Sequence, residues 1–415
     1  MNAGTSPDHA LCKEKSMSAP FLTNLSQVSM KESQKSRRLL AIDLLRGLTL
    51  LFMIIVNNNG NDQQAYSVLR HASWNGFTPT DLVFPTFLFL VGLTTVLSTA
   101  KRLEEGRSKT SLILHVVYRS IILCLLGLVV NSFPYFHLAT MRFYGVLPRI
   151  ALCYLIVATF YIVSPDWRSK VVVLIAVLVG YWILMRIVPV PGFGIPGRDI
   201  PLLDSNGNLT AWMDRRIFSA AHLYERTRDP EGLLSTIPAL GTVLIGLLTG
   251  FWLRTGRTQV QKVWGILTAG IGCVLLGSLW NYSFPINKKL WTSSFVLFAA
   301  GWSLLLLAFL CWFIDLRRMR TGKQPAAKNP PFDTLLLVFG TNAIFSYVLS
   351  ELLASTLASI HLQSGLNLVE WAYQTIHLGG HDAAFASLLY SLAYTGLCWL
   401  IVYFLLYKRR IFLKI

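Results

Sequence analysis

The chain has 415 residues, of which 53% are hydrophobic and 14% are charged. Soluble domains usually carry about 25% charged residues. The composition therefore excludes an ordinary soluble domain and predicts an integral membrane protein with the lipid bilayer as its main partner. The formal net charge of +17 would suggest nucleic-acid binding in a soluble protein. Here the basic residues lie between apolar segments, so we attribute the charge to membrane orientation and expect no nucleic-acid partner.

Residues 1–36 are rich in Ser, Lys and Asn and lack an apolar stretch behind a basic start. We expect a disordered cytoplasmic tail there and no signal peptide. A helix needs about 20 apolar residues to cross roughly 30 Å of hydrocarbon. Ten segments meet this need, near residues 39–57, 81–100, 111–131, 143–163, 169–189, 236–254, 261–281, 290–314, 334–357 and 384–407. The sequence thus predicts that residues 37–415 form one all-α, polytopic transmembrane helix bundle of about ten spans.

Basic residues gather in alternate connections between these segments. They lie within residues 31–38, 101–109, 168–170, 254–262, 317–328 and 408–414. Because cytoplasmic loops carry an excess of Lys and Arg, we expect both termini in the cytoplasm. The loop around His71 then opens to the opposite side, as do residues 190–235 and 358–383.

Ionisable side chains at membrane depth are costly unless they are paired or line a cavity, so they are candidates for function. The polar residues of this kind are Asp43, Arg46, His115 and Arg119 on the cytoplasmic half, Asn57, His71, Asp81 and Arg149 on the outer half, and Asn342 and Glu351 in the ninth segment. An interhelical pair that only stabilises the bundle is the alternative for each. For Asp43 and Arg46, three residues apart, that alternative is as plausible as a functional role.

His71 lies in a short connection between two apolar segments, and Gly60, Gly76 and Pro79 predict a shaped loop there. A neutral imidazole is the usual general base for a hydroxyl or an amine, and it can also be acylated itself. Asp81 or Asn57 could fix its tautomer or polarise a carbonyl oxygen. The sequence leaves open which of them touches His71.

Two other patterns are rejected. Residues 192–197 spell Gly-x-Gly-x-x-Gly, but they follow a membrane span and open no helix after a strand, so we expect no dinucleotide site. His377 and His381 are four residues apart, but two intervening glycines weaken any helix that would align them. We expect no metal site. The six cysteines have no paired spacing that would predict a disulfide framework.

Several motifs together resemble the heparan-α-glucosaminide N-acetyltransferase family of multi-span membrane enzymes, bacterial relatives included. They are Asp43-x-x-Arg46-Gly47, Val56-Asn57, His71-Ala72-Ser73-Trp74-Asn75-Gly76, Asp81-Leu82-Val83-Phe84-Pro85, Gly145-Val146-Leu147-Pro148-Arg149, Asp229-Pro230-Glu231-Gly232, Asn287-Lys288-Lys289-Leu290-Trp291-Thr292 and Gly340-Thr341-Asn342-Ala343-Ile344. The likeness spans about residues 38–410 and is most specific around His71.

This resemblance implies transfer of an acetyl group from cytosolic acetyl-coenzyme A to an acceptor across the membrane, with His71 as the catalytic histidine and Asn57 also in the active site. Two departures bear on the acceptor. The stretch between Asn57 and His71 is three residues longer than in the animal enzyme, and we expect no large luminal N-terminal domain. The expected acceptor is therefore an amino sugar or other glycan at a bacterial inner membrane.

The phosphates of coenzyme A are expected at a basic cytoplasmic mouth, although orientation alone would also place basic residues there. We assign catalysis to His71, Asn57 and Asp81, cofactor binding to Arg46, Arg119, Asp43 and Asn342, and acceptor binding to Trp74, Asn75, Arg149 and Lys288. Direct transfer is slightly favoured over an acetyl-histidine intermediate. N- versus O-acetylation and the oligomeric state, a homodimer included, stay open.

A transporter is the alternative from another class, because ten spans with buried charge also suit a permease. It predicts broken half-helices in two related halves, which the sequence does not show clearly. A family member that has lost catalysis and acts as a scaffold is a third interpretation. The presence of both His71 and Asn57 argues against it.

Overall fold

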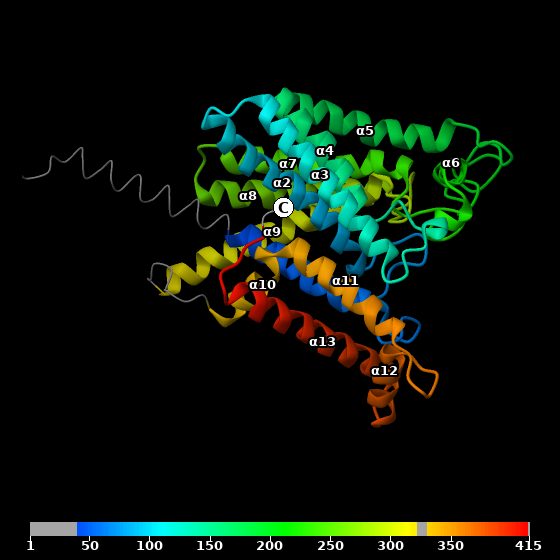
Figure 1. Ribbon diagram of the computed structural model, residues 1–415. Helices are drawn as coiled ribbons and strands as arrows, with labels where there is room; N and C mark the ends of the chain where they lie inside the picture. Colours follow the sequence, from blue (N-terminus) through cyan, green and yellow to red (C-terminus); the bar gives the residue numbers. More distant parts are fainter. Residues whose placement is uncertain (1–39, 322–329, 414–415) are drawn as a thin grey trace, which may run out of the picture. The chain divides into compact units, whose positions relative to one another are not determined.

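The computed structural model describes residues 40–321 and 330–413, and its described part is helical, with three isolated β-bridges in loops (Figure 1). Within these residues, nine helices are long and apolar enough to cross a membrane, or ten when one bent pair is counted as a span. The predicted all-α polytopic bundle is therefore confirmed. The predicted tail, residues 1–36, lies outside the described residues.

The observed spans follow the predicted segments. They are the helix Leu40–Asn57, α2 (Val83–Glu104) with the 3-10 turn η2 (Pro79–Leu82) before it, α3 (Lys109–Ser132), α4 (Val146–Val163), α5 (Trp167–Ile187), α7 (Leu233–Arg254), α8 (Gln259–Trp280), α9 (Ser293–Thr321), the pair α10 (Pro331–Thr341) and α11 (Ala343–Ser359), and α13 (Ala383–Val402) with the π-helical turn η5 (Tyr403–Tyr407). The connections contain shorter helices: η1 (Ser67–Leu69), η3 (Leu138–Thr140), α6 (Leu209–Ile217), η4 (Ala220–His222) and α12 (Leu368–Leu378).

Short polar residues set several helix starts. Ser108, Asp166 and Thr258 immediately precede α3, α5 and α8, and each accepts a hydrogen bond from a backbone N–H in the first turn of its helix. Such N-caps satisfy donors that a helix start would otherwise leave without a partner. Local sequence signals therefore account for these boundaries without any tertiary contact.

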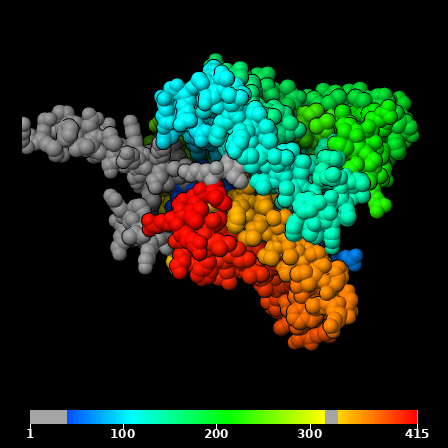
Figure 2. Space-filling view, in the orientation of Figure 1, coloured from blue at the N-terminus to red at the C-terminus, as the bar shows by residue number. Residues whose placement is uncertain are grey.

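The helices pack in two groups that face each other. In one group α2 packs on α7, α3 on α4 and α8 on α9; in the other α13 contacts α10, α11 and α12 (Figure 1). The helix Leu40–Asn57 belongs to the second group, because Leu50 and Ile54 share a core with Phe339 and Tyr394. In Figure 2, cyan residues of α3 and its following loop form much of the visible face above the orange and red residues.

Two glycines bring the helix Leu40–Asn57 and α10 into backbone contact. A Cβ atom added to Gly47 would lie 2.0 Å from the carbonyl oxygen of Leu336, and one added to Gly340 would lie 2.1 Å from that of Asp43. Small residues at such crossings are typical of membrane helix pairs, where close packing and not the hydrophobic effect drives association. This contact fixes the turn that contains Asp43 and Arg46 against α10.

The prediction of one continuous ninth span over residues 334–357 is wrong. The segment is two helices, α10 and α11, bent by 80° at Asn342. The side chain of Asn342 bonds with the backbone of the chain's C-terminal segment: its amide donates to the Ile411 carbonyl at 3.2 Å, and its oxygen accepts from the Leu413 N–H at 2.9 Å. These long-range bonds favour a break that the apolar pattern alone does not indicate.

We predict that Gly340→Ala destabilises the protein by about 1 to 3 kcal/mol, because the new methyl group forces the two helix backbones apart. The measurement is the thermal unfolding midpoint in detergent, and the matched control is Gly272→Ala in α8, where an added Cβ atom meets nothing within 4 Å. Equal midpoints for both variants would contradict the importance of this backbone contact.

Candidate active site

The carboxylate of Asp81 is fully buried at the start of the second span. Thr78 and Asp81 form a capping box around η2, with Pro79 at its first position, so the local sequence Thr-Pro-x-Asp explains this turn. One carboxylate oxygen lies 2.8 Å from His71 Nδ1. The other accepts hydrogen bonds from the N–H groups of Thr78 at 3.0 Å and Ala72 at 3.2 Å.

Lys288 completes a cluster with His71 and Asp81, which we call the His71 cluster. Its Nζ atom lies 2.9 Å from His71 Nδ1, 3.2 Å from His71 Nε2 and 3.6 Å from Asp81 Oδ1. An ionised carboxylate only accepts hydrogen bonds, so the proton of neutral His71 belongs on Nδ1 and Nε2 keeps its lone pair. Burial lowers the pKa of Lys288, an effect that Asp81 opposes but does not reverse. The His71 side chain itself is 44% exposed.

A tight turn between α8 and α9 positions Lys288. The side chain of Asn287 accepts a hydrogen bond from Leu290 N–H at 2.9 Å, and Asn287 N–H donates to the Thr292 hydroxyl at 3.0 Å. The Asn287 amide also donates to the side-chain oxygen of Asn75 at 3.1 Å. The loop that contains His71 and the loop that contains Lys288 are therefore linked directly.

Asn57, a predicted catalytic residue, is exposed and lies away from His71. Within the described residues no hydrogen bond joins Asn57 to His71. Its side chain instead lies beside the carboxyl group of Glu351 in α11. Glu351 was recognisable in the sequence as an ionisable residue at membrane depth, but only the fold reveals Asn57 as its partner.

Trp74 and Asn75, predicted to bind the acceptor, line a cavity of about 570 Å³ together with residues 201–205, Arg228 and Pro285. Trp74 Nε1 donates to the Leu203 carbonyl at 2.9 Å, and the guanidinium of Arg228 lies 4.6 Å from the Trp74 ring centroid. Through Asn75 this cavity adjoins the turn of Lys288. We call it the Trp74 cavity.

Arg149, the remaining residue predicted to bind the acceptor, lies in the protein interior and is 2% exposed. Its guanidinium donates to the Gly232 carbonyl at 3.0 Å and to the Ser235 hydroxyl, and it lies 5.2 Å from the Trp291 ring centroid. These contacts join the starts of α4 and α7. Arg149 does not line the Trp74 cavity, and its role in acceptor binding stays a prediction.

A buried charge cluster that the sequence analysis did not assign holds the long loop before α7. Arg142 donates to both oxygens of Asp229, at 2.8 and 2.6 Å, and also to Glu231. The Asp229 N–H in turn donates to Asp214 at 3.1 Å. Burial raises the pKa of Asp214 to about 7. Charged residues in loops are usually solvated, so the sequence gives no signal that Asp229 and Glu231 are partners of Arg142. It shows them only as part of a family motif.

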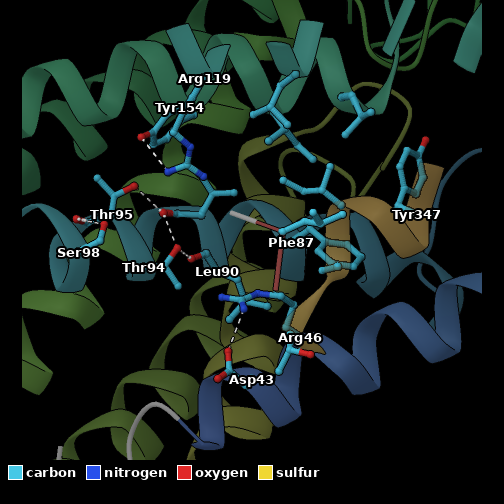
Figure 3. Close-up of a pocket in the computed structure, with 18 of the residues that line it drawn as sticks. Asp43, Arg46, Phe87, Leu90, Thr94, Thr95, Ser98, Arg119, Tyr154 and Tyr347 are labelled. Atoms are coloured by element: carbon cyan, nitrogen blue, oxygen red, sulfur yellow. Dashed lines mark hydrogen bonds and ion pairs between the residues drawn. The ribbon is translucent and has the colours of Figure 1, made fainter. Parts of the chain in front are cut away.

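A second, longer cavity of about 670 Å³ runs between the two helix groups, and we call it the long cavity. Polar side chains occupy one end: Arg46 donates to Asp43 at 2.9 Å and to the Gly340 carbonyl at 3.1 Å, and Arg119 donates to the Tyr154 hydroxyl at 3.2 Å (Figure 3). Arg102 and His115 line it as well.

The long cavity follows α2 towards the His71 cluster. Phe87 and Arg102 both line it, and the helix between them is roughly 22 Å long at 1.5 Å per residue. The stretch of helix from Asp81 to Phe87 is only about 9 Å long. Asn342 does not line the cavity, but its neighbours Thr341 and Ala343 do, as do Phe412 and Leu413 of the segment that Asn342 holds.

The structure thus brings together some predicted site residues and separates others. His71, Asp81 and Lys288 form one cluster, Trp74 and Asn75 line the adjoining cavity, and Asp43, Arg46 and Arg119 share the long cavity. No three His, Cys, Asp or Glu side chains gather as metal ligands within residues 40–321 and 330–413.

Comparison with known proteins gives a consistent match. The family described as heparan-alpha-glucosaminide N-acetyltransferase, catalytic, matches residues 38–283, which include His71 and Asp81 but not Lys288. The chain is 27% identical over 445 residues to the heparan-alpha-glucosaminide N-acetyltransferase of Mus musculus, covering 94% of this chain and 63% of that protein. For the protein of that name from Homo sapiens the identity is 26% over 430 residues, with 91% and 60% covered. The chain therefore spans about three fifths of the length of these relatives.

We predict that Asp214 makes stability fall as pH rises. The folded protein keeps the Asp214 proton up to a pH of about 7, whereas the unfolded chain releases it near the ordinary value of 3.8. The unfolded chain therefore binds fewer protons between these values, and the free energy of unfolding decreases across that window. Asp214→Asn should remove this contribution.

The test compares thermal midpoints in detergent from pH 5 to 8. Asp214→Asn should gain stability over wild type as the pH rises, whereas the control Asp62→Asn, at an exposed position, should follow wild type. A constant difference between wild type and Asp214→Asn at every pH would refute the assignment.

Proposed function

The chain belongs to the heparan-alpha-glucosaminide N-acetyltransferase family, and on this premise we propose that it transfers an acetyl group from acetyl-coenzyme A to an acceptor on the opposite side of the membrane. The observation that most supports this function is the His71 cluster, in which a buried carboxylate and a lysine flank a solvent-accessible histidine. The long cavity has a cationic end, and its lining along α2 reaches Phe87, about 9 Å of helix from Asp81 of this cluster.

The long cavity suits acetyl-coenzyme A in its charge pattern. At the end with Arg46, Arg102 and Arg119, guanidinium groups provide donors for the nucleotide phosphates. Further along α2 the lining turns to apolar and hydroxyl side chains such as Leu90 and Thr94, which fit a long flexible arm containing amides. In this arrangement Asp43 orients Arg46, and Asn342 holds the segment that includes Phe412 and Leu413 at the cavity wall.

His71 is the proposed general base. Asp81 holds the Nδ1 proton, so Nε2 carries the lone pair. In place of its contact with Lys288, Nε2 takes a proton from the acceptor amine or hydroxyl as the acceptor nitrogen or oxygen attacks the thioester carbonyl. The new C–N or C–O bond forms as the C–S bond breaks, and the proton held by His71 can return to the leaving thiolate. The Lys288 ammonium group lies where it can stabilise the negative charge that develops on the carbonyl oxygen.

Trp74 and Asn75 are the proposed acceptor contacts, because the Trp74 cavity adjoins the His71 cluster through Asn287. We propose an amino sugar or another glycan as the acceptor, since the cavity combines an aromatic ring with polar groups. In this arrangement Asn57 contributes indirectly, through its position beside the carboxyl group of Glu351. We favour direct transfer over an acetyl-histidine intermediate, because Asp81 and Lys288 already fix the imidazole as a base.

We propose that both termini and the cationic end of the long cavity face the cytoplasm, and that the enzyme resides in a bacterial inner membrane. The support is the alternation of basic and non-basic connections along the chain.

A transporter is the second candidate, and the bend between α10 and α11 favours it, because broken helices are typical of transporters. That class also predicts a second broken helix in a related half of the chain. The described residues contain a single bent pair, so this observation alone does not displace the enzyme.

We predict that His71→Ala lowers acetyl transfer by at least about 100-fold while leaving acetyl-coenzyme A binding close to that of wild type. The assay supplies acetyl-coenzyme A and a panel of amino sugars to the purified protein and measures the free thiol released. His361→Ala, an exposed histidine in a separate loop, is the control and should stay active. Full activity of His71→Ala would exclude the proposed mechanism. No thiol release by the wild-type protein with any acceptor, together with no binding of acetyl-coenzyme A, would favour a transporter.

We also predict that Arg46→Ala weakens acetyl-coenzyme A binding about tenfold or more, because hydrogen bonds to charged groups contribute about 1.5 to 3 kcal/mol. Isothermal titration calorimetry on the detergent-solubilised protein measures this directly. Arg257→Ala removes a cation that does not line the long cavity and should bind like wild type. Unchanged affinity in Arg46→Ala would remove this residue from the proposed phosphate site.

A further inference from the structure

The C-terminal segment, residues 411–413, forms part of the wall of the long cavity. Phe412 and the residue after it both line this cavity. The segment lies at the cationic end, because its backbone bonds to Asn342, and the Gly340 carbonyl, two residues earlier in the chain, accepts a hydrogen bond from Arg46. The reaction proposed above gives this segment no contact with a ligand.

Two features of the chain set the course of this segment. Just after η5, Arg410 adopts a φ of 56°, a left-handed conformation that non-glycine residues rarely take, and it turns the chain. The Ile411 N–H then donates to a carbonyl of η5 at 3.0 Å. Beyond the turn, the Asn342 side chain binds the Ile411 carbonyl at 3.2 Å and the Leu413 N–H at 2.9 Å. Phe412 lies between these two bonded residues, so its place at the cavity wall is held on both sides.

Both the Phe412 ring and the nearby cations are accessible to a ligand. Phe412 is 48% exposed, and the Arg46 side chain is 25% exposed. Arg102 and Arg119 also line the cavity and are partly exposed. Among the described residues that line it, Asp43 is the one carboxylate, and it is bonded to Arg46. A ligand at this end therefore meets an aromatic ring and an excess of positive charge.

A nucleotide matches both features of this end of the cavity. The flat face of a base stacks on an aromatic side chain, and phosphate oxygens accept hydrogen bonds from guanidinium groups. Inorganic phosphate would leave the ring without a partner, and an apolar ligand would leave the arginines without one. Coenzyme A carries an adenine nucleotide at one end, with phosphates on both sides of the ribose.

The length of the cavity favours this orientation of coenzyme A. Along α2 its lining runs from Arg102 to Phe87, roughly 22 Å of helix. With adenine beside Phe412, the pantetheine arm extends along the apolar and hydroxyl lining towards Phe87, on the side of the His71 cluster. The opposite orientation would place the phosphates against apolar side chains.

We propose that Phe412 stacks on the adenine ring of coenzyme A, so that the C-terminal segment is part of the donor site. The inference rests on the proposed function, because it assigns a subsite within the same cavity. It makes Phe412 a specificity-determining residue. A donor that keeps the acetylated arm but lacks the adenosine, such as acetyl-pantetheine, loses this contact.

Isothermal titration calorimetry of coenzyme A with the full chain in detergent tests the contact. Phe412→Leu keeps an apolar side chain but removes the aromatic face, and we expect binding to weaken about fivefold or more. Phe412→Tyr keeps the ring and should bind like wild type. The matched control is Phe404→Leu, at an exposed phenylalanine that does not line the cavity, and its affinity should not change.

Two fragments of coenzyme A separate stacking from a role in shaping the cavity. The adenosine bisphosphate half contains the base without the arm, and phosphopantetheine contains the arm without the base. Phe412→Leu should weaken binding of the first by the same factor as coenzyme A and leave binding of the second unchanged. Equal weakening of both fragments would mean that Phe412 only shapes the cavity, and it would overturn the adenine contact.

Failure of this inference differs from failure of the proposed function. The adenine subsite is refuted, and the acetyltransferase stands, if the wild-type protein binds coenzyme A, His71→Ala is inactive and Phe412→Leu binds coenzyme A as tightly as wild type. Absence of coenzyme A binding by the wild-type protein would refute both.

Discussion

The buried carboxylate of Asp81 is the constraint on which the candidate active site depends. A carboxylate removed from water is costly unless hydrogen bonds and opposite charge replace its hydration. Here the donors come from His71, Ala72 and Thr78, and the nearby positive charge comes from Lys288. Three chain segments must therefore converge on one carboxylate. The orientation of the imidazole follows from this convergence and needs no separate cause.

The same physical rule organises the other charges at membrane depth. Arg46 bonds with Asp43 and with a backbone carbonyl of α10, and Arg119 bonds with a tyrosine hydroxyl. Both residues also line the long cavity. Arg149, inside the protein, donates to the Gly232 carbonyl and the Ser235 hydroxyl. A charge that is half satisfied by protein and faces a cavity is stable in a membrane and still able to bind a ligand.

Backbone contacts determine where the long cavity lies. Gly47 and Gly340 let the helix Leu40–Asn57 meet α10 without side chains between them, and this contact holds Arg46 at the cavity wall. The bend at Asn342 then directs α11 away from α10, so that residues on both sides of the bend line the same cavity. Along α2 the lining of this cavity runs from Arg102 at the cationic end to Phe87, which is about 9 Å of helix from Asp81.

The sequence alone determined the spans other than the ninth, because hydrocarbon thickness sets the length of an apolar helix and polar caps such as Ser108 set its start. It also determined that His71 lies in a shaped loop and that Asp43, Arg46 and Arg119 are unusual at their depth. Only the tertiary structure decided which side chains these residues contact. It paired His71 with Asp81 and Lys288, paired Asn57 with Glu351, and broke the ninth span at Asn342. The reason is that spans follow from local interactions with the bilayer, whereas pairs such as His71 with Lys288 join residues far apart in the chain, and no periodicity encodes which helices meet.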